Sequence, residues 1–273
     1  METQLSLIPA SEHPTALESQ WLNAISPADF INNNKNFDVL MMKYRCAIRE
    51  IQTKLEVLDD EFSAVNKRNP ISSIKSRVKS PASIYEKLRR RDLPFTEDSI
   101  VKNLDDVAGI RVICPFISDI YTIANLLTSQ DDITVLKIKD YIKAPKSNGY
   151  RSYHMIVEIP VFFTEGKFPM RAEIQIRTIG MDFWASVDHQ LRYKKTIGAD
   201  KDIEAIEAEL LKCAQTVSET DCHMEEIKDM IGDFEKIYPE KIKYSKRGRC
   251  SIHPEPFLFY LHLLYPLFVK RIS

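Results

Sequence analysis

The sequence is poor in glycine, which supplies 7 of its 273 residues, whereas an average protein contains roughly 7%. No two of these glycines are closer than 14 residues in the chain. Phosphate-binding loops of the P-loop and dinucleotide-binding kinds need several glycines within about eight residues. The sequence therefore excludes both kinds of loop, and any phosphate group that this chain binds has to be held by side chains.

Cysteine pairs, a signal segment and a membrane-spanning run are also missing. The five cysteines are scattered and form no Cys-x-x-Cys pair, which favours free thiols in a reducing cytosol. The start of the chain lacks the basic-then-apolar pattern of a signal peptide. The longest apolar run has 13 residues, 257–269, and contains Pro266, so it is too short to span a bilayer. We expect a cytoplasmic protein without stable membrane insertion.

Charge is nearly balanced over the whole chain but not along it. The net charge of −1 predicts no DNA partner. Residues 67–91 nevertheless hold nine basic side chains and one acidic one, and residues 202–235 hold eleven acidic and two basic ones. The basic block lies within sequence that has the periodicity of folded structure, and it is therefore the first candidate for binding an anion.

The spacing of apolar residues predicts an α+β fold. Steps of three and four from Met41 to Val65 indicate a long helix that packs on the core or on a partner subunit. Serine followed by proline at 80–81 predicts the start of a second helix, which ends near Asp92. A period of two predicts strands at 107–114, 133–138, 153–159 and 170–177, with helices at 119–127, 179–195 and 202–230. We expect a mixed four- to five-stranded sheet flanked by helices, including long N- and C-terminal helices.

The same pattern divides the chain into three parts. Residues 1–36 have little periodicity and are interpreted as a mobile leader. Residues 37–235 form the expected domain with its flanking helices. Residues 236–273 are an atypical tail, basic at first and then aromatic and aliphatic. This tail is interpreted as an irregular terminus, although packing on an oligomer or binding to a membrane surface stays open.

Two acidic residues are candidates for metal binding and catalysis. In the strand 171–177, Glu173 shares one face with Arg171, Gln175 and Arg177, because side chains alternate across a strand. Such a face is either solvated or part of a site. Asp106 precedes another strand, where it either caps a turn or converges with Glu173. Two converging carboxylates would suit Mg²⁺, which prefers oxygen ligands and keeps substrate phosphates in its shell.

Basic side chains near residue 80 are candidates for binding a polyphosphate. Arg77 and Lys79 precede the second helix, and further polar and basic residues follow at helical steps, namely Ser83, Lys87, Arg90 and Arg91. Arginine and lysine can bind phosphates directly, and the arginine plane can also stack on a base. A solvated helix face or an RNA contact is the alternative interpretation.

Two further segments suit a nucleotide. Residues 137–154 mix lysines with Tyr141, Tyr150 and Tyr153 around an Asn-Gly turn, a pattern that can stack a base, although a generic loop can have the same composition. In the helix that follows residue 178, Asp182 begins a polar stripe with Ser186 and His189. Phe183, Trp184, Val187 and Leu191 lie opposite this stripe, and the two aromatic residues among them are expected in the core.

The order and the amino-acid sequences of these segments over residues 69–195 resemble the synthetase domain of the RelA/SpoT-like family. The resemblance is carried by residues 76–91, 106–114, 148–154, 173–178 and 182–186. From about residue 37 to residue 232, the chain looks like a small, single-domain alarmone synthetase with a nucleotidyltransferase-like fold. The resemblance implies a GTP diphosphokinase that moves the pyrophosphate of ATP to the 3′-hydroxyl of GTP or GDP. The products would be AMP and (p)ppGpp, the alarmone of the stringent response.

The resemblance also implies roles for single residues and an assembly. Arg77 and Arg111 would sandwich the adenine, Asp106 and Glu173 would bind Mg²⁺, and Glu173 would accept the 3′-hydroxyl proton. Four residues would hold the ATP phosphates: Lys79, Ser83, Lys87 and Arg90. Tyr150 would stack on guanine, and four residues would line the GTP side: Lys146, His154, Gln175 and Asp182. The flanking helices resemble those of homotetrameric members.

Two alternatives stay open at this point. One is an enzyme of the same fold that acts on adenine nucleotides or on the 3′ end of tRNA, because stacking on Tyr150 does not identify a base. The other is a catalytically silent module that binds a nucleotide or single-stranded RNA. Hydrolysis of the alarmone is not expected, because none of the six histidines is followed by aspartate and the His-Asp pair of hydrolase domains is missing.

Overall fold

The computed structural model describes residues 37–66, 68–193 and 203–237. The leader 1–36 and residues 238–273 of the tail lie outside the described residues. By its internal contacts the chain divides into two units, the first ending at Glu225 and the second beginning at Glu226. All the site residues considered below belong to the first unit.

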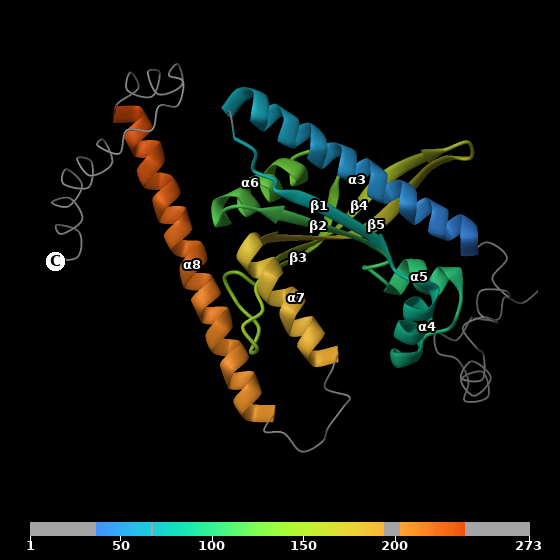
Figure 1. Cartoon of the computed structure of the whole chain (residues 1–273). Helices are drawn as coiled ribbons and strands as arrows, with labels where there is room; N and C mark the ends of the chain where they lie inside the picture. Colours follow the sequence, from blue (N-terminus) through green and yellow to red (C-terminus); the bar gives the residue numbers. More distant parts are fainter. Residues whose placement is uncertain (1–36, 67, 194–202, 238–273) are drawn as a thin grey trace, which may run out of the picture. The chain divides into compact units, whose positions relative to one another are not determined.

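A mixed five-stranded sheet forms the centre of this unit, as the sequence predicts (Figure 1). Its strands lie in the order β1-β2-β5-β4-β3. Strands β2 and β5 are parallel, and the other neighbours are antiparallel. The strands are β1 (Ser73–Val78), β2 (Ala108–Cys114), β3 (Thr134–Asp140), β4 (Tyr153–Phe163) and β5 (Gly166–Thr178).

Six helices accompany the sheet in the described part of the chain: α3 (Phe37–Asn66), α4 (Pro81–Arg90), α5 (Glu97–Asn103), α6 (Ile117–Thr128), α7 (Ile179–Tyr193) and α8 (Ile203–Ile237). Helix α3 packs across β1, β2, β5 and β4 and beside α6. Figure 1 shows α3 on one side of the sheet and α7 on the other. Among the described helices we find none with the length and apolarity that a bilayer crossing requires.

Alternation along the strands separates a buried face from a polar one. On the central strand β5, Ala172, Ile174 and Ile176 are buried in the core that α3 covers. Glu173 and Gln175 lie between them in the sequence and point to the opposite face. The polar residues of this strand therefore lie on the face of the sheet that α3 leaves uncovered.

Local sequence signals explain where the helices begin. Pro81 occupies the first turn of α4, and the Ser80 side chain caps it by accepting a hydrogen bond from the Ser83 amide. Thr96 caps α5 in the same way through the Ser99 amide. The predicted start of α4 is thus confirmed, whereas the short helix α5 and the edge strand β1 were not expected from the sequence.

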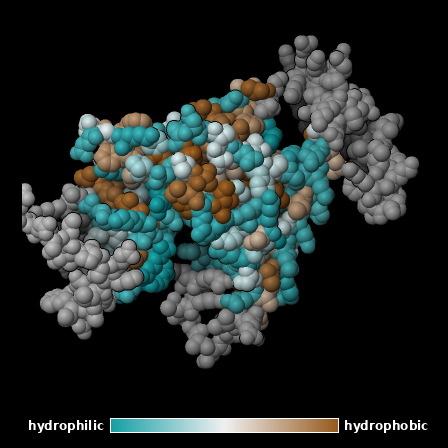
Figure 2. Space-filling view, turned by 180° about the vertical axis from the view of Figure 1, so that it is seen from behind, coloured by the Kyte–Doolittle hydropathy of each residue, from teal (hydrophilic) through white to brown (hydrophobic). Residues whose placement is uncertain are grey.

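One prediction about α7 is wrong in part. Trp184 is buried, as expected, but Phe183 is 63% exposed, and Val187 and Leu191 are exposed too. Helix α7 turns Met181, Asp182, Trp184 and Asp188 inward, so the apolar side chains that follow Ile179 at steps of four stay on the outside. Apolar surface is not confined to α7, since the face seen from behind also carries apolar patches among hydrophilic residues (Figure 2).

Candidate active site

The register of the sheet aligns polar side chains in rows across its uncovered face. Lys75 on β1 pairs with Arg111 on β2, which pairs with Gln175 on β5, which in turn pairs with His154 on β4. In the next row, Arg77 pairs with Gly109 and Gly109 with Glu173. Residues that are about 100 positions apart in the chain are thereby neighbours, because four strands meet here in the right register.

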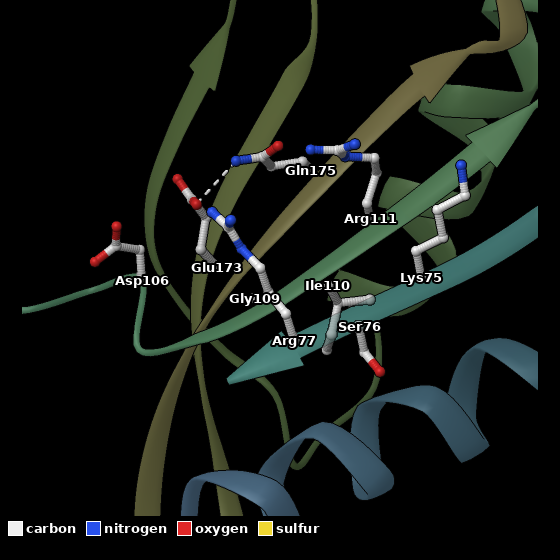
Figure 3. Close-up of a pocket in the computed structure, with 9 residues that line it drawn as sticks. All are labelled: Lys75, Ser76, Arg77, Asp106, Gly109, Ile110, Arg111, Glu173 and Gln175. Atoms are coloured by element: carbon white, nitrogen blue, oxygen red, sulfur yellow. Dashed lines mark hydrogen bonds between the residues drawn. The ribbon is translucent and has the colours of Figure 1, made fainter. Parts of the chain in front are cut away.

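These rows line a cleft of about 220 Å³ (Figure 3). The residues that line it are Lys75, Ser76, Arg77, Asp106, Gly109, Ile110, Arg111, Glu173 and Gln175. A Cβ atom on Gly109 would meet the Arg77 side chain at an ordinary contact distance of 3.6 Å. Glycine is therefore not needed here to avoid a clash. It leaves room on the floor of the cleft between Arg77 and Glu173.

Asp106, on the loop before β2, is paired with two lysines. Its Oδ2 atom accepts a hydrogen bond from Lys79 Nζ at 3.0 Å, and its Oδ1 atom lies 2.7 Å from Lys87 Nζ on α4. Burial by itself raises the pKa of this carboxyl group, but the two ammonium groups outweigh burial and hold the pKa below its usual value. Asp106 is therefore an ionised carboxylate with two cations beside it.

Glu173, on β5, contacts two polar neighbours. Gln175 Nε2 donates a hydrogen bond to Glu173 Oε2 at 2.9 Å, and His154 Nδ1 lies 3.4 Å from Oε1. Burial raises the pKa of Glu173, but the contacts with His154 and Gln175 outweigh burial and lower it. Asp106 opposes them slightly, since its negative charge raises the pKa of Glu173. The two carboxylates are thus close enough for the charge of Asp106 to affect the pKa of Glu173.

The pair of carboxylates fits a magnesium ion that is shared with a substrate. No group of three or more His, Cys, Asp or Glu side chains suited to a metal gathers within residues 37–66, 68–193 and 203–237. A closed protein cage for a metal is therefore not formed by these residues. Two ionised carboxylates on one cleft are the usual protein contribution to Mg²⁺ when phosphate oxygens and waters complete its shell.

The loop before β4 presents aromatic rings next to a lysine. Lys146 Nζ lies 4.7 Å from the centre of the Tyr150 ring and 4.8 Å from that of Tyr141. The Tyr150 hydroxyl lies 2.8 Å from His154 Nε2. His154 thus connects this loop to Glu173, and the predicted GTP-side residues Lys146, Tyr150, His154 and Gln175 lie together.

Asp182, at the start of α7, binds three cations. Its Oδ1 atom accepts hydrogen bonds from Arg111 Nη1 at 3.1 Å and from Arg177 Nη1 at 3.2 Å, and its Oδ2 atom accepts one from Lys75 at 3.3 Å. Burial, and then the charge of Arg177, lower the pKa of Arg111, whereas Asp182 raises it. Positive charge is thus crowded at this end of the cleft, as a site for an anionic ligand requires.

Only some of the residues predicted to bind ATP lie at the cleft. Arg77 and Arg111 line the cleft, and Lys79 and Lys87 reach it through Asp106. Ser83 and Arg90 are exposed on α4 and do not line the cleft that the described residues form. The Ser83 hydroxyl accepts a hydrogen bond from Ser80 at 2.9 Å. Ser186 and His189 are exposed on α7 and do not join Asp182 at the site.

Two residues of the site were not predicted from the sequence. Lys75 lines the cleft, and its signal was the appearance of cations at 75, 77 and 79, a period of two that marks a strand. Arg177 stands on the polar face of β5, where the alternation placed it, but nothing in the sequence indicated its partners. These partners come from β5, from α7 and from the loop before β4 that holds Tyr150.

Comparison with known proteins agrees with this arrangement. A region found in RelA and SpoT proteins matches residues 76–198. The chain is 46% identical over 154 residues to the GTP pyrophosphokinase YwaC of Bacillus subtilis, covering 56% of this chain and 73% of that protein. It is 33% identical over 215 residues to the GTP pyrophosphokinase YjbM of the same organism, covering 79% of this chain and 99% of that protein.

A solved structure of similar sequence has the same fold. The crystal structure of small alarmone synthetase 1 from Bacillus subtilis, bound to its product pppGpp, matches with a TM-score of 0.65 and 34% identity. The match covers 72% of this chain and 99% of that one. By sequence and by fold, this chain belongs to the RelA/SpoT family and is similar to its small members.

Proposed function

We propose that this chain is a GTP pyrophosphokinase, which transfers the pyrophosphate of ATP to the 3′-hydroxyl of GTP or GDP. The observation that carries the proposal is the position of Glu173. It lies on one cleft with Asp106, between the basic residues of β1 and α4 and the aromatic loop that holds Tyr150. The names of the relatives and the product in the neighbouring crystal structure support the same reaction.

ATP would bind on the side of β1, β2 and α4. Arg77 and Arg111 stand on adjacent strands two residues out of register, so that their guanidinium groups can take the two faces of an adenine. Arg111 Nε is buried and has no hydrogen-bond partner among the described residues, which leaves a donor for a ligand. The phosphates would be held by Lys79, Ser83, Lys87 and Arg90. Lys79 and Lys87 already contact Asp106. Ser83 and Arg90 would have to move toward the phosphates when a nucleotide binds.

The acceptor nucleotide would bind on the side of β4 and its loop. The ring of Tyr150 is the platform for the guanine, and Lys146, stacked on that ring, carries the charge that a 5′-phosphate needs. His154, Gln175 and Asp182 lie next to this ring or are connected to it by hydrogen bonds. The acceptor's 3′-hydroxyl would then point at Glu173.

Transfer forms a bond between the 3′-oxygen of the acceptor and the β-phosphorus of ATP, and breaks the bond between that phosphorus and the oxygen that leaves with AMP. Glu173, ionised because of its contacts, accepts the proton of the 3′-hydroxyl. Asp106 and Glu173 would hold Mg²⁺ together with the phosphates, and the ion would supply neutralisation of negative charge. Lys79 and Lys87 hold phosphate oxygens and fix the line of attack, which is the main contribution a protein makes to this class of transfer.

The setting of the enzyme is part of the proposal. Residues 37–235 would be the catalytic domain, working in the cytoplasm, where the free thiols of Cys46, Cys114, Cys213 and Cys222 stay reduced. We expect a homotetramer, as the resemblance of the flanking helices implies, and the exposed apolar side chains along α7 offer a surface for a subunit contact. Truncation after residue 236 should leave the synthesis rate unchanged.

Incubation of the purified chain with Mg²⁺ and ATP, with GTP, GDP, excess ATP or tRNA as separate acceptors, tests the function. Anion-exchange chromatography should show AMP and a guanine nucleotide carrying the added pyrophosphate only in the reactions that contain GTP or GDP. Transfer to adenine nucleotides or to tRNA alone would support an enzyme of the same fold with another acceptor. Nucleotide binding without transfer to any acceptor would indicate a silent binding module.

A further inference from the structure

Arg177 is a buried charge that lies beside the cleft without lining it. Its residue is only 4% exposed. An arginine is almost never buried to this degree unless its charge and its donors are all paired. Four side chains from three segments accept hydrogen bonds from its guanidinium group: Tyr150 and Ser152 in the loop before β4, Gln175 on β5 and Asp182 on α7.

The shortest of these bonds holds the ring that we assign to the acceptor base. Arg177 Nη2 donates to the Tyr150 hydroxyl at 2.6 Å, and the Arg177 Cζ atom lies 5.1 Å from the centre of the same ring. The proton of that hydroxyl is then free for His154 Nε2, 2.8 Å away. Tyr150 is thereby fixed at its hydroxyl end by two partners, although its backbone belongs to a loop.

A second bond leads to the donor side of the cleft. Arg177 Nη1 and Arg111 Nη1 bind the same oxygen of Asp182, at 3.2 Å and 3.1 Å. Arg111 is one of the two arginines proposed for adenine. Asp182 therefore connects the arginine of the donor base to the arginine that holds the ring of the acceptor base.

Arginine suits this place because its donors form a rigid fork. Arg177 uses all three of its nitrogens, with Nε on Ser152, Nη1 on Asp182, and Nη2 on both Tyr150 and Gln175. Lysine has one nitrogen on a flexible stem and cannot reach four partners on three segments at once. A lysine at this position keeps the positive charge but loses some of the hydrogen bonds that the guanidinium group makes.

We propose that Arg177 is a positioning residue for the acceptor nucleotide, holding the Tyr150 ring in the plane that stacks on guanine, with Asp182 linking it to Arg111. The inference rests on the proposed function, because it takes Tyr150 as the acceptor platform. Arg177 itself touches neither the transferred group nor the metal. Its loss should therefore weaken acceptor binding and leave donor binding nearly intact.

The test is direct binding of GDP and of a non-hydrolysable ATP analogue, each measured alone by titration calorimetry with the full chain. For Arg177→Lys we expect the Kd for GDP to rise about tenfold or more, as loss of one charge-assisted hydrogen bond implies. The Kd for the ATP analogue should stay within about twofold. Asp182→Asn should weaken both ligands, because it loosens Arg111 as well as Arg177.

Arg171→Lys is the matched control. Arg171 stands on the same face of β5, six residues earlier, but its guanidinium group binds Asp105 and the Lys102 carbonyl. This variant should bind GDP like the wild type. If Arg177→Lys fails to unfold cooperatively, Tyr150→Phe replaces it, since it removes the hydroxyl that Arg177 holds and keeps the ring.

The outcomes separate this inference from the proposed function. If Arg177→Lys is folded and binds GDP as the wild type does, or loses both nucleotides equally, Arg177 is not a positioning residue for the acceptor. If Tyr150→Phe stands in and keeps full GDP affinity, the same conclusion holds. A wild-type chain that binds no guanine nucleotide overturns the proposed function itself.

Discussion

Gly149 lies against Ala214 so closely that a side chain on the glycine would collide with it. A Cβ atom built on Gly149 would be 2.5 Å from Ala214 Cβ, and the backbone of Gly149 has a φ of +85°. Helix α8 therefore packs directly on the turn that precedes Tyr150. Arg151 Nη1 strengthens this contact by donating to the Ala214 carbonyl at 3.3 Å.

Gly149→Ala should displace this turn and weaken acceptor binding. The variant suffers both the collision and an unfavourable backbone conformation, which together should cost about 1–3 kcal/mol of unfolding free energy. We expect a raised KM for GTP and an unchanged KM for ATP, measured by steady-state synthesis. Adding Ala214→Gly removes the collision but not the backbone strain, and should restore only part of the loss. Full activity of Gly149→Ala alone would mean that α8 does not hold the turn.

Glu173→Gln should abolish synthesis while leaving the fold unchanged. The amide keeps the shape and one acceptor for Gln175, but it cannot take a proton and is a poorer ligand for Mg²⁺. We expect kcat to fall about 10²–10⁴-fold, with thermal unfolding within a few degrees of the wild type. Glu158→Gln on the neighbouring strand β4 is the control and should keep its activity. Retained synthesis in Glu173→Gln would contradict its role as proton acceptor.

The elements with strong periodicity could be predicted from the sequence, and the weakly patterned ones could not. Helix α3 and strands β2, β4 and β5 have long apolar patterns, and they stand close to where we predicted them. Strand β1 is short, lies at the edge of the sheet and has exposed polar residues. Its alternating lysine and arginine were therefore interpreted as part of a basic block and not as a strand. Arg77 was predicted and Lys75 was not, because only the strand assignment makes them equivalent.

Contacts between side chains on different elements could not be predicted from the sequence. The alternation of β5 placed Glu173, Gln175 and Arg177 on one face, but the partners of Arg177 depend on strand order and on where α7 begins. The exposed position of Phe183 has the same origin. Because Phe183 is next to Trp184 in the sequence, either residue could face the core. The hydrogen bond between Asp182 and Arg111 fixes the orientation of the helix, and in this orientation Trp184 is buried.

The Asp221 carboxyl group should make stability depend on pH. Burial raises its pKa above the usual value, and the Thr178 hydroxyl, which donates to it at 2.6 Å, and Arg151 only partly oppose burial. A raised pKa means that the folded chain binds this proton more tightly than the unfolded chain does. Stability from this group is therefore full at low pH and is lost as the pH rises from the unfolded value of about 3.9 through the folded value.

Asp221→Asn removes this titration and keeps an acceptor for Thr178. Below the unfolded pKa, the variant and the wild type should unfold at the same urea concentration. As the pH rises to 7, the variant should become the more stable of the two. Asp229→Asn, an exposed residue of the same helix, controls for the change in net charge. A wild type that equals or exceeds Asp221→Asn at pH 7 would show that the carboxylate is well accommodated when ionised.

The outer face of α7 should mediate self-association. Ile179, Phe183, Val187 and Leu191 recur at steps of four and are 37% to 63% exposed, an apolar stripe that water disfavours. Val187→Lys places a charge in the middle of the stripe without touching the buried side of the helix. We expect sedimentation to show a shift from four times the 31.6 kDa chain mass to smaller species, with the helical content unchanged. Gln190→Lys adds the same charge at an exposed polar position of the helix and should leave the assembly intact. An unaltered mass for Val187→Lys would mean that the subunits meet through another surface.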